Sequence, residues 1–261
     1  MDDSKEMTAD SLFNGALTCF QNKNGYRFSI DSVLLAHFSL ALKKSKILDL
    51  GCGCGILGLI LLYRKKCQIL SIDGLELQQN LVEVARKNST VNGFSSKFTI
   101  TAGDLKKIDI IFPCEWFSHI ICNPPFFRVG SGRTSSGNEE YLARHQASAN
   151  ISEIIAAASY ALKNKGVFSL VFPAESMAEL LHCLVLKRMQ PKRIRLVYSY
   201  PEADSATLVL VECVKNGGVG VQILKPLYIY NKRHGDYTEE VNAMYRPNPA
   251  ELDKESVESS C

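Results

Sequence analysis

The sequence lacks the cysteine pairs on which disulfide scaffolds and zinc sites are built. Its nine cysteines are an odd number, and no Cys-x-x-Cys pair occurs among the 261 residues. Cys122, Cys183 and Cys213 lie in apolar runs, where a free thiol behaves as a small hydrophobic side chain. We therefore expect no disulfide framework and no metal site, and the pattern favours a reducing, cytoplasmic location.

Long apolar runs and a strong net charge are also missing. No stretch approaches the roughly 20 apolar residues of a membrane span, and residues 1–6 do not form a signal-peptide core. The 30 Lys and Arg nearly balance the 27 Asp and Glu. Basic residues nevertheless cluster at 43–46, 64–66, 187–188 and 192–195, which permits a nucleic-acid partner without requiring one. We expect no membrane partner. No single surface patch establishes an oligomeric state, and a monomer is favoured.

Residues 47 to 214 alternate short apolar runs with longer helical patterns. This alternation is typical of βαβ units, in which helices cover both faces of a mostly parallel sheet. It predicts an α/β fold with a Rossmann-like sheet. The expected strands are 47–50, 68–73, 97–101, 117–122, 167–172, 193–199 and, last, 206–214, and the expected helices are 56–64, 77–92, 151–162 and 174–188.

Three regions fall outside this alternation. Residues 17–29 predict a hairpin around Asn24-Gly25, followed by a helix over 31–42. Residues 129–138 are small and polar, and a long loop of this kind in a compact domain indicates a mobile lid over a site. The charged end predicts a disordered tail. The expected division is an N-terminal extension (1–45), a main domain (46–246) and the tail (247–261).

Residues 49–55, Asp-Leu-Gly-Cys-Gly-Cys-Gly, lie between the first strand of the main domain and its helix. A strand, then glycines, then a helix N-terminus lets a ligand approach the backbone closely and meet free N–H groups. One interpretation is a dinucleotide site, because Gly53-x-Gly55-x-x-Gly58 matches that fingerprint and Asp73 follows about 20 residues later. A NAD-dependent dehydrogenase is therefore one alternative.

Three acidic residues favour S-adenosylmethionine instead. Asp49 precedes the glycines, as in the Asp-x-Gly-x-Gly-x-Gly pattern of methyltransferases that use this cofactor. Glu76 follows the second strand, in position for the ribose hydroxyls, and Asp104 follows the third, in position for the adenine amine. Either acid alone can equally cap the helix that follows its strand. Together they predict a cofactor site made of Asp49, Gly51, Gly53, Gly55, Glu76, Asp104 and Asn123.

Residues 123–126, Asn-Pro-Pro-Phe, end the apolar run 117–122. The Asn123 amide oxygen accepts hydrogen bonds from N–H groups, and the residue before a proline is held extended. The turn can therefore aim this oxygen and the Pro124 carbonyl at one point, while Phe126 offers a flat face for stacking. Such a turn alone can simply end a strand. Beside a methyl donor it indicates a clamp for a planar exocyclic amine.

With these motifs the chain resembles the amino-methylating class I methyltransferases, and most of all the bacterial tRNA(Val) adenine-N6 methyltransferases. The Asn-Pro-Pro turn is shared with glutamine and guanine-N2 methyltransferases. Residues 21–32, 226–230 and 235–240 distinguish the tRNA(Val) adenine-N6 methyltransferases better. The chain departs from the family at Gln146, where an acid is expected, and at Phe126, where many relatives carry Tyr. The resemblance covers nearly the whole chain, through residues 21–32 (Gln-Asn-Lys-Asn-Gly-Tyr-Arg-Phe-Ser-Ile-Asp-Ser), 48–53, 123–127, 143–145 (Ala-Arg-His), 226–230 (Pro-Leu-Tyr-Ile-Tyr) and 235–240 (Gly-Asp-Tyr-Thr-Glu-Glu).

The resemblance implies transfer of the sulfonium methyl of S-adenosylmethionine to adenine N6 in tRNA, beside the anticodon. Asn123 and Pro124 would hold the amine, and Phe126 would stack on a base flipped out of its loop. Substrate contacts are expected from Arg27, Arg128 and Arg144, and tRNA is the expected partner. Other functions stay open: guanine-N2 methylation of rRNA, methylation of a protein glutamine, and RNA binding without catalysis.

Overall fold

The computed structural model describes residues 7–23, 28–39, 44–124 and 150–248. Several predicted features lie outside these ranges. They are the Asn24-Gly25 turn, Arg27, Phe126, Arg128, Arg144, the loop 129–138 and the last residues of the expected tail, 249–261.

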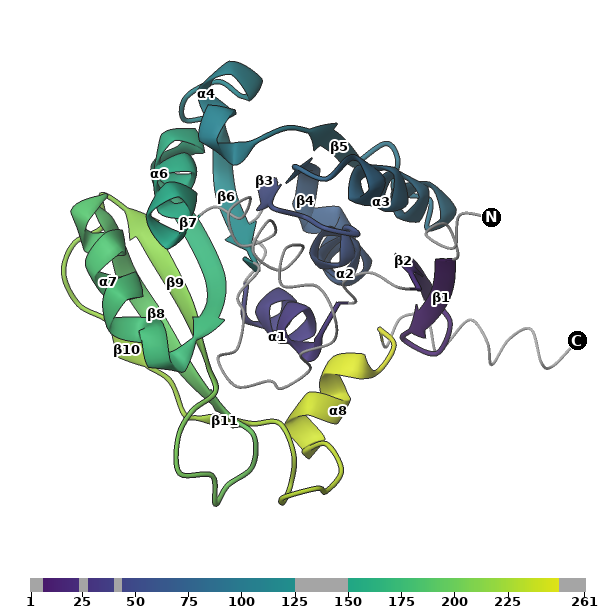
Figure 1. The fold of residues 1–261 in the computed structure, drawn as a ribbon, viewed down its shortest axis with the longest axis vertical. Helices are drawn as coiled ribbons and strands as arrows, with labels where there is room; N and C mark the ends of the chain where they lie inside the picture. The colour runs from purple at the N-terminus through teal and green to yellow at the C-terminus, as the bar shows by residue number, and fades with distance from the viewer. Residues whose placement is uncertain (1–6, 24–27, 40–43, 125–149, 249–261) are drawn as a thin grey trace, which may run out of the picture.

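The described residues form a nine-stranded sheet in the order β10-β8-β9-β7-β6-β3-β4-β5, with β11 also beside β8. Strands β5, β4, β3, β6 and β7 run parallel, whereas β9 is antiparallel to both β7 and β8. The predicted mostly parallel α/β sheet is confirmed (Figure 1). The strands are β3 (Ser45–Leu50), β4 (Ile69–Glu76), β5 (Phe98–Ala102), β6 (Phe117–Cys122), β7 (Leu162–Pro173), β8 (Met189–Tyr198), β9 (Leu208–Lys215), β10 (Gln222–Ile223) and β11 (Leu227–Tyr228).

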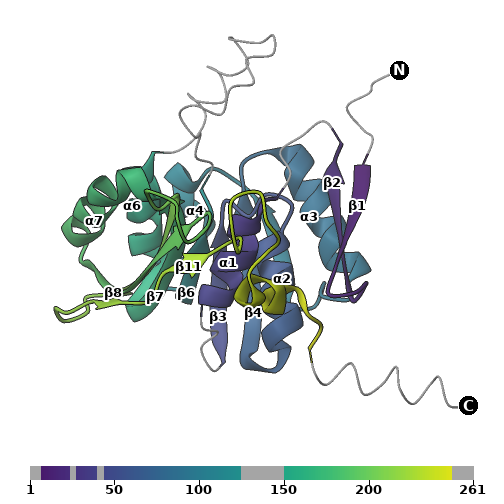
Figure 2. The ribbon, with the colours of Figure 1, turned by 90° about the horizontal axis from the view of Figure 1, so that it is seen from below.

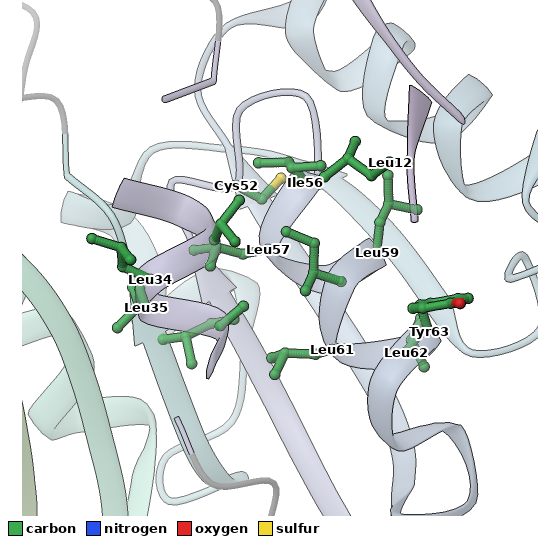
Figure 3. Packing of buried hydrophobic residues seen from close by; sticks show 14 of the residues in the cluster. Leu12, Leu34, Leu35, Cys52, Ile56, Leu57, Leu59, Leu61, Leu62 and Tyr63 are labelled. Carbon is green, nitrogen blue, oxygen red and sulfur yellow. The ribbon is translucent and has the colours of Figure 1, made fainter. Parts of the chain in front are cut away.

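Helices cover both faces of this sheet, because successive strand residues point to opposite faces and both sets are apolar. Ile47 packs in one core and Leu48 in the other. The first core includes side chains of α1 (Ile30–Phe38), α2 (Ile56–Lys65), α3 (Gln79–Val91) and α8 (Glu239–Tyr245), and Figure 3 shows part of it. The second includes side chains of α4 (Ile108–Ile111), α6 (Ile151–Ala161) and α7 (Met177–Leu186). Figure 2 shows the ribbons of these three helices. Short 3-10 turns are η2 (Lys66–Gln68), η3 (Leu105–Lys107) and η4 (Ala174–Ser176).

The structure has an N-terminal hairpin that begins before the predicted one, whose Asn24-Gly25 turn lies outside the described residues. Strands β1 (Met7–Leu12) and β2 (Leu17–Asn22) pair antiparallel, so the turn falls at residues 13–16. Phe13, Asn14 and Gly15 all have positive φ there, at 55°, 55° and 94°. Asn-Gly suits such a turn because both residues tolerate the left-handed region. The chain holds an Asn-Gly pair on each side of β2, and the first one makes the turn.

The hairpin is attached to α3 through two asparagine side chains. Asn88 accepts from the Phe20 N–H through Oδ1 (2.7 Å) and donates from Nδ2 to the Phe20 carbonyl (2.9 Å). Asn92 does the same with Thr18, at 2.9 and 2.7 Å. Side chains of Leu12, Leu17 and Cys19 join the core that contains α2 and α3. The hairpin and the sheet therefore share one hydrophobic core.

Other boundaries also differ from the predictions: α1 ends at Phe38, and β7 and β8 begin earlier than expected, at Leu162 and Met189. Strand β4 continues three residues beyond Asp73, which places Glu76 at its end. The strand expected to be last is followed by β10 and β11, two-residue strands too short to leave a periodic pattern. Asn248, within the expected tail, bonds to Tyr63 and Arg64. No helix in the described part of the chain has the length and apolar character that crossing a membrane requires.

Candidate functional site

Strand register brings four separate segments to the carboxyl edge of the sheet. Asp49 of β3 lies opposite Gly74 of β4 and Ile121 of β6, and Glu76 of β4 lies opposite Ala102 of β5. The glycine loop, Glu76, the Asp104 segment and the Asn123 turn therefore follow neighbouring strands at one edge. From β3 the chain adds β4 and β5 on one side and β6 on the other. Open α/β sheets bind ligands at such a reversal point.

The glycine loop presents bare backbone toward open space. Gly51, Gly53 and Gly55 have φ of 74°, 56° and 84°, a region that disfavours other residues. A Cβ added at Gly51 or Gly53 would meet no atom of the described residues within 4 Å. The loop is fixed from below, because the N–H groups of Gly51 and Cys52 donate to the Leu75 carbonyl at 2.9 and 3.0 Å. This shape leaves room for a ligand directly against the backbone, at the start of α2.

Gly58, the third glycine of the dinucleotide fingerprint, has a different role. A Cβ there would lie 2.5 Å from the Phe98 ring, so glycine lets α2 pack closely against β5. This packing requirement is independent of the cofactor. Asp73, the acid of the same fingerprint, lies within β4 and is half-buried; burial raises its pKa, partly offset by Lys46. Asp73 therefore does not occupy the end of the strand.

Glu76 occupies that end and holds the glycine loop in place. Its side chain is 7% exposed. One carboxylate oxygen accepts from the Gly53 N–H and the other from the Gln78 N–H, both at 2.9 Å. Each carboxylate oxygen has a second lone pair. Glu76 can thus anchor the loop and still accept from ribose hydroxyls, a role that stays a prediction.

Asp49 is a buried carboxylate without a hydrogen-bond partner of normal geometry. It is 0% exposed, and neither oxygen is satisfied within the described residues. Burial raises its pKa to about 7, the nearby backbone N–H of Gly58 offsets part of this rise, and the Glu76 carboxylate adds to it. Burying an unpaired charge is costly. The arrangement suits a ligand that brings positive charge.

Asn123 has one satisfied and one unsatisfied end. Its Nδ2 donates to the Ser32 Oγ on α1 at 3.0 Å, whereas its Oδ1 is buried and has no partner within the described residues. Pro124 beside it is buried. Sequence reasoning did not single out Ser32 as a site residue, although it ends the first segment of the family resemblance, 21–32.

Asp104 caps the turn that follows β5. Its side chain accepts from the Lys106 N–H at 2.9 Å, and η3 begins at the next residue. Asp104 therefore acts as a cap, one of its two expected roles. Its contact with adenine stays a prediction.

Comparisons with known proteins agree on the class of enzyme. A family model described as methyltransferase small domain matches residues 29–190. The chain belongs to this methyltransferase family. A relative named tRNA1(Val) (adenine(37)-N6)-methyltransferase from Shewanella sp. (strain MR-4) is 30% identical over 161 residues, 61% of this chain and 66% of that protein. One of the same name from Photobacterium profundum is 26% identical over 222 residues, 85% of this chain and 90% of that protein.

Solved structures of this methyltransferase fold confirm the architecture. A predicted O-methyltransferase from Agrobacterium tumefaciens matches 84% of this chain and 98% of its own, with a TM-score of 0.65 and 23% identity. The methyl donor of this methyltransferase is S-adenosylmethionine. The residues present fit it, since the open glycine loop suits a nucleoside and the unpaired Asp49 carboxylate suits its positive charges. The dehydrogenase alternative is inconsistent with this family.

Proposed function

We propose that this methyltransferase modifies the exocyclic N6 amine of adenine in tRNA, beside the anticodon, in the cytoplasm. The observation that carries the proposal is the buried Oδ1 of Asn123, which has no partner among the described residues and directly follows β6 at the edge that holds the glycine loop. Buried acceptors in native proteins are normally hydrogen-bonded, and we infer that the substrate supplies the donor here. The names of the relatives support adenine N6 as that donor group.

The proposed chemistry depends on positioning a poor nucleophile. The lone pair of an exocyclic amine is delocalised into the ring. When Asn123 Oδ1 and the Pro124 carbonyl accept its two N–H bonds, the amine is held with its lone pair free and favoured toward pyramidal geometry. S-adenosylmethionine supplies the methyl group. Orientation of this kind lowers a barrier by up to about 7–11 kcal/mol in the best cases.

The remaining predicted substrate contacts belong to the same proposal. Phe126 would stack on the flipped adenine, and Arg27, Arg128 and Arg144 would contact phosphates. All four lie outside the described residues. Replacing any one of these arginines with Gln should weaken tRNA binding and reduce its dependence on salt, because each phosphate contact releases counterions.

The test is incubation with labelled S-adenosylmethionine and, in separate reactions, total tRNA, rRNA or protein, followed by nucleoside and amino-acid analysis. The proposal expects label in N6-methyladenosine. Label in N2-methylguanosine of rRNA, or in a protein glutamine, would overturn adenine as the substrate and support the corresponding alternative. Binding of tRNA without any methyl transfer would overturn the proposal that this protein catalyses methylation, and would support RNA binding without catalysis.

A further inference from the structure

Ser32 contacts the proposed amine clamp from a distant part of the chain. It lies in the first turn of α1, is 3% exposed, and its Oγ accepts from Asn123 Nδ2 across 91 positions of sequence. The helix that carries it is fixed in the first core, since Val33, Leu34 and Leu35 are 0% exposed. Figure 3 shows Leu34 and Leu35 in this core. The Ser32 hydroxyl is therefore held rigidly against Asn123, the residue after β6.

In this structure the contact occupies the donor end of the Asn123 amide. A primary amide has a donor end and an acceptor end. Because Nδ2 is engaged by Ser32, the end left without a partner is Oδ1. Rotation of the amide by 180° would instead present an NH2 group, which cannot accept a hydrogen bond from an amine.

Hydrogen bonds at the two ends of an amide reinforce each other. Donation from Nδ2 to an acceptor increases the negative charge on the amide oxygen, and a donor at that oxygen polarises Nδ2 in return. A substrate N–H, the Asn123 amide and the Ser32 hydroxyl would form such a chain. A substrate that presents only an acceptor gains nothing from it.

We propose that Ser32 is a positioning residue, which orients the Asn123 amide so that its oxygen accepts from the substrate. The choice of an N–H donor as substrate group then depends on Ser32 as well as on Asn123. This inference rests on the proposed function. It concerns a residue for which the comparisons assign no role.

Burial alone does not explain the Ser32 contact. Ser39, directly after the same helix, is 4% exposed, and its buried Oγ has no partner within the described residues. The described part of the fold thus holds a buried serine hydroxyl to which none of the described residues is hydrogen-bonded. Ser39→Ala removes the same atom from an equally buried site, which makes it a matched control for Ser32→Ala.

The first experiment measures methylation of tRNA by Ser32→Ala, Ser32→Thr and Ser39→Ala. Loss of one hydrogen bond predicts a decrease in kcat of about tenfold for Ser32→Ala. The KM for S-adenosylmethionine should stay within about twofold, Ser32→Thr should recover most of the lost rate, and Ser39→Ala should match wild type. In an Asn123→Ala background, Ser32→Ala should have no further effect, because it acts through that amide.

The second experiment needs no methyl acceptor. The side-chain amide protons of Asn123 are followed by 15N NMR hydrogen exchange and assigned by their loss in Asn123→Ala. They should exchange at least about tenfold faster in Ser32→Ala than in wild type or Ser39→Ala, because a hydrogen bond protects them. If wild type methylates no tRNA, the proposed function fails, yet this exchange rate still decides the role of Ser32. Unchanged exchange in Ser32→Ala, or additive effects of the two substitutions on kcat, would overturn the proposal.

Discussion

At the scale of single residues, the site is marked by buried polar atoms that the protein leaves unpaired. The Asp49 carboxylate and the Asn123 amide oxygen both lack partners within the described residues. Each such group costs about 1–3 kcal/mol or more in the folded state. Both residues were predicted from their motifs. The Ser32 contact could not be, because it joins positions 91 residues apart and depends on how α1 packs.

The Asp49 carboxylate predicts a pH-dependent effect of Asp49→Asn on stability. Its pKa rises from an ordinary 3.8 to about 7, so the folded state favours the neutral form. The associated stability is fully present below pH 3.8 and is lost as the pH rises through 7. Relative to wild type, the ligand-free variant should therefore gain about 2–3 kcal/mol between pH 5 and pH 8. Urea unfolding of both proteins across this range measures the difference. A difference that does not change with pH would contradict a raised pKa.

At the scale of elements, the glycines at 51–58 form one motif in the sequence but meet two separate requirements, open space for a ligand and close packing of α2 on β5. Gly51 and Gly53 face open space, whereas Gly58 lies under the Phe98 ring. The strand-glycine-helix order was predictable because local propensity fixes it. The separate packing role of Gly58 was not predictable, because it depends on the distance between α2 and β5. The hairpin of β1 and β2 was missed for a similar reason, since two Asn-Gly pairs flank β2 and the prediction used only the second of them.

Alanine substitutions at two glycines should separate these roles. Gly58→Ala places a Cβ 2.5 Å from Phe98 and should destabilise the fold by about 1–3 kcal/mol. Gly53→Ala meets no atom within 4 Å but has φ of 56°, so strain of about 1–2 kcal/mol is expected. Its added methyl points into the proposed cofactor space, so affinity for S-adenosylmethionine should also fall by more than about tenfold. Urea unfolding and titration calorimetry measure the two effects. Equal cofactor affinity in Gly53→Ala and wild type would place the cofactor elsewhere.

At the scale of the whole molecule, the N-terminal hairpin, α3 and the glycine loop form one connected unit. Asn88 is 0% exposed and donates from Nδ2 to both the Phe20 and the Cys54 carbonyls, at 2.9 Å. The parallel order of the sheet followed from the alternation in the sequence. The docking of the hairpin could not be predicted from the sequence, because it depends on Asn88 and Asn92, whose partners lie 68 and 74 positions away.

Asn88→Ala should destabilise the entire fold rather than the hairpin alone. It leaves the Phe20 N–H and the carbonyls of Phe20 and Cys54 without this partner, which predicts a loss of about 2–4 kcal/mol. Thermal and urea unfolding should show one cooperative transition at a lower midpoint. The exposed Asn164, which bonds only to the Asn216 side chain among the contacts of the described residues, is the control. Equal stability of Asn88→Ala and Asn164→Ala would show that the hairpin is not anchored in this way.

The central claim is that Asn123 holds the amine that receives the methyl group. The most direct measurement compares kcat for tRNA methylation by wild type, Asn123→Ala and Asn164→Ala, with N6-methyladenosine as the product counted. Loss of a preorganised polar contact at the reacting group predicts a decrease of about 100- to 1000-fold for Asn123→Ala. The Asn164→Ala rate should equal that of wild type. An Asn123→Ala rate within about threefold of wild type, well short of the decrease expected for such a contact, would contradict the account.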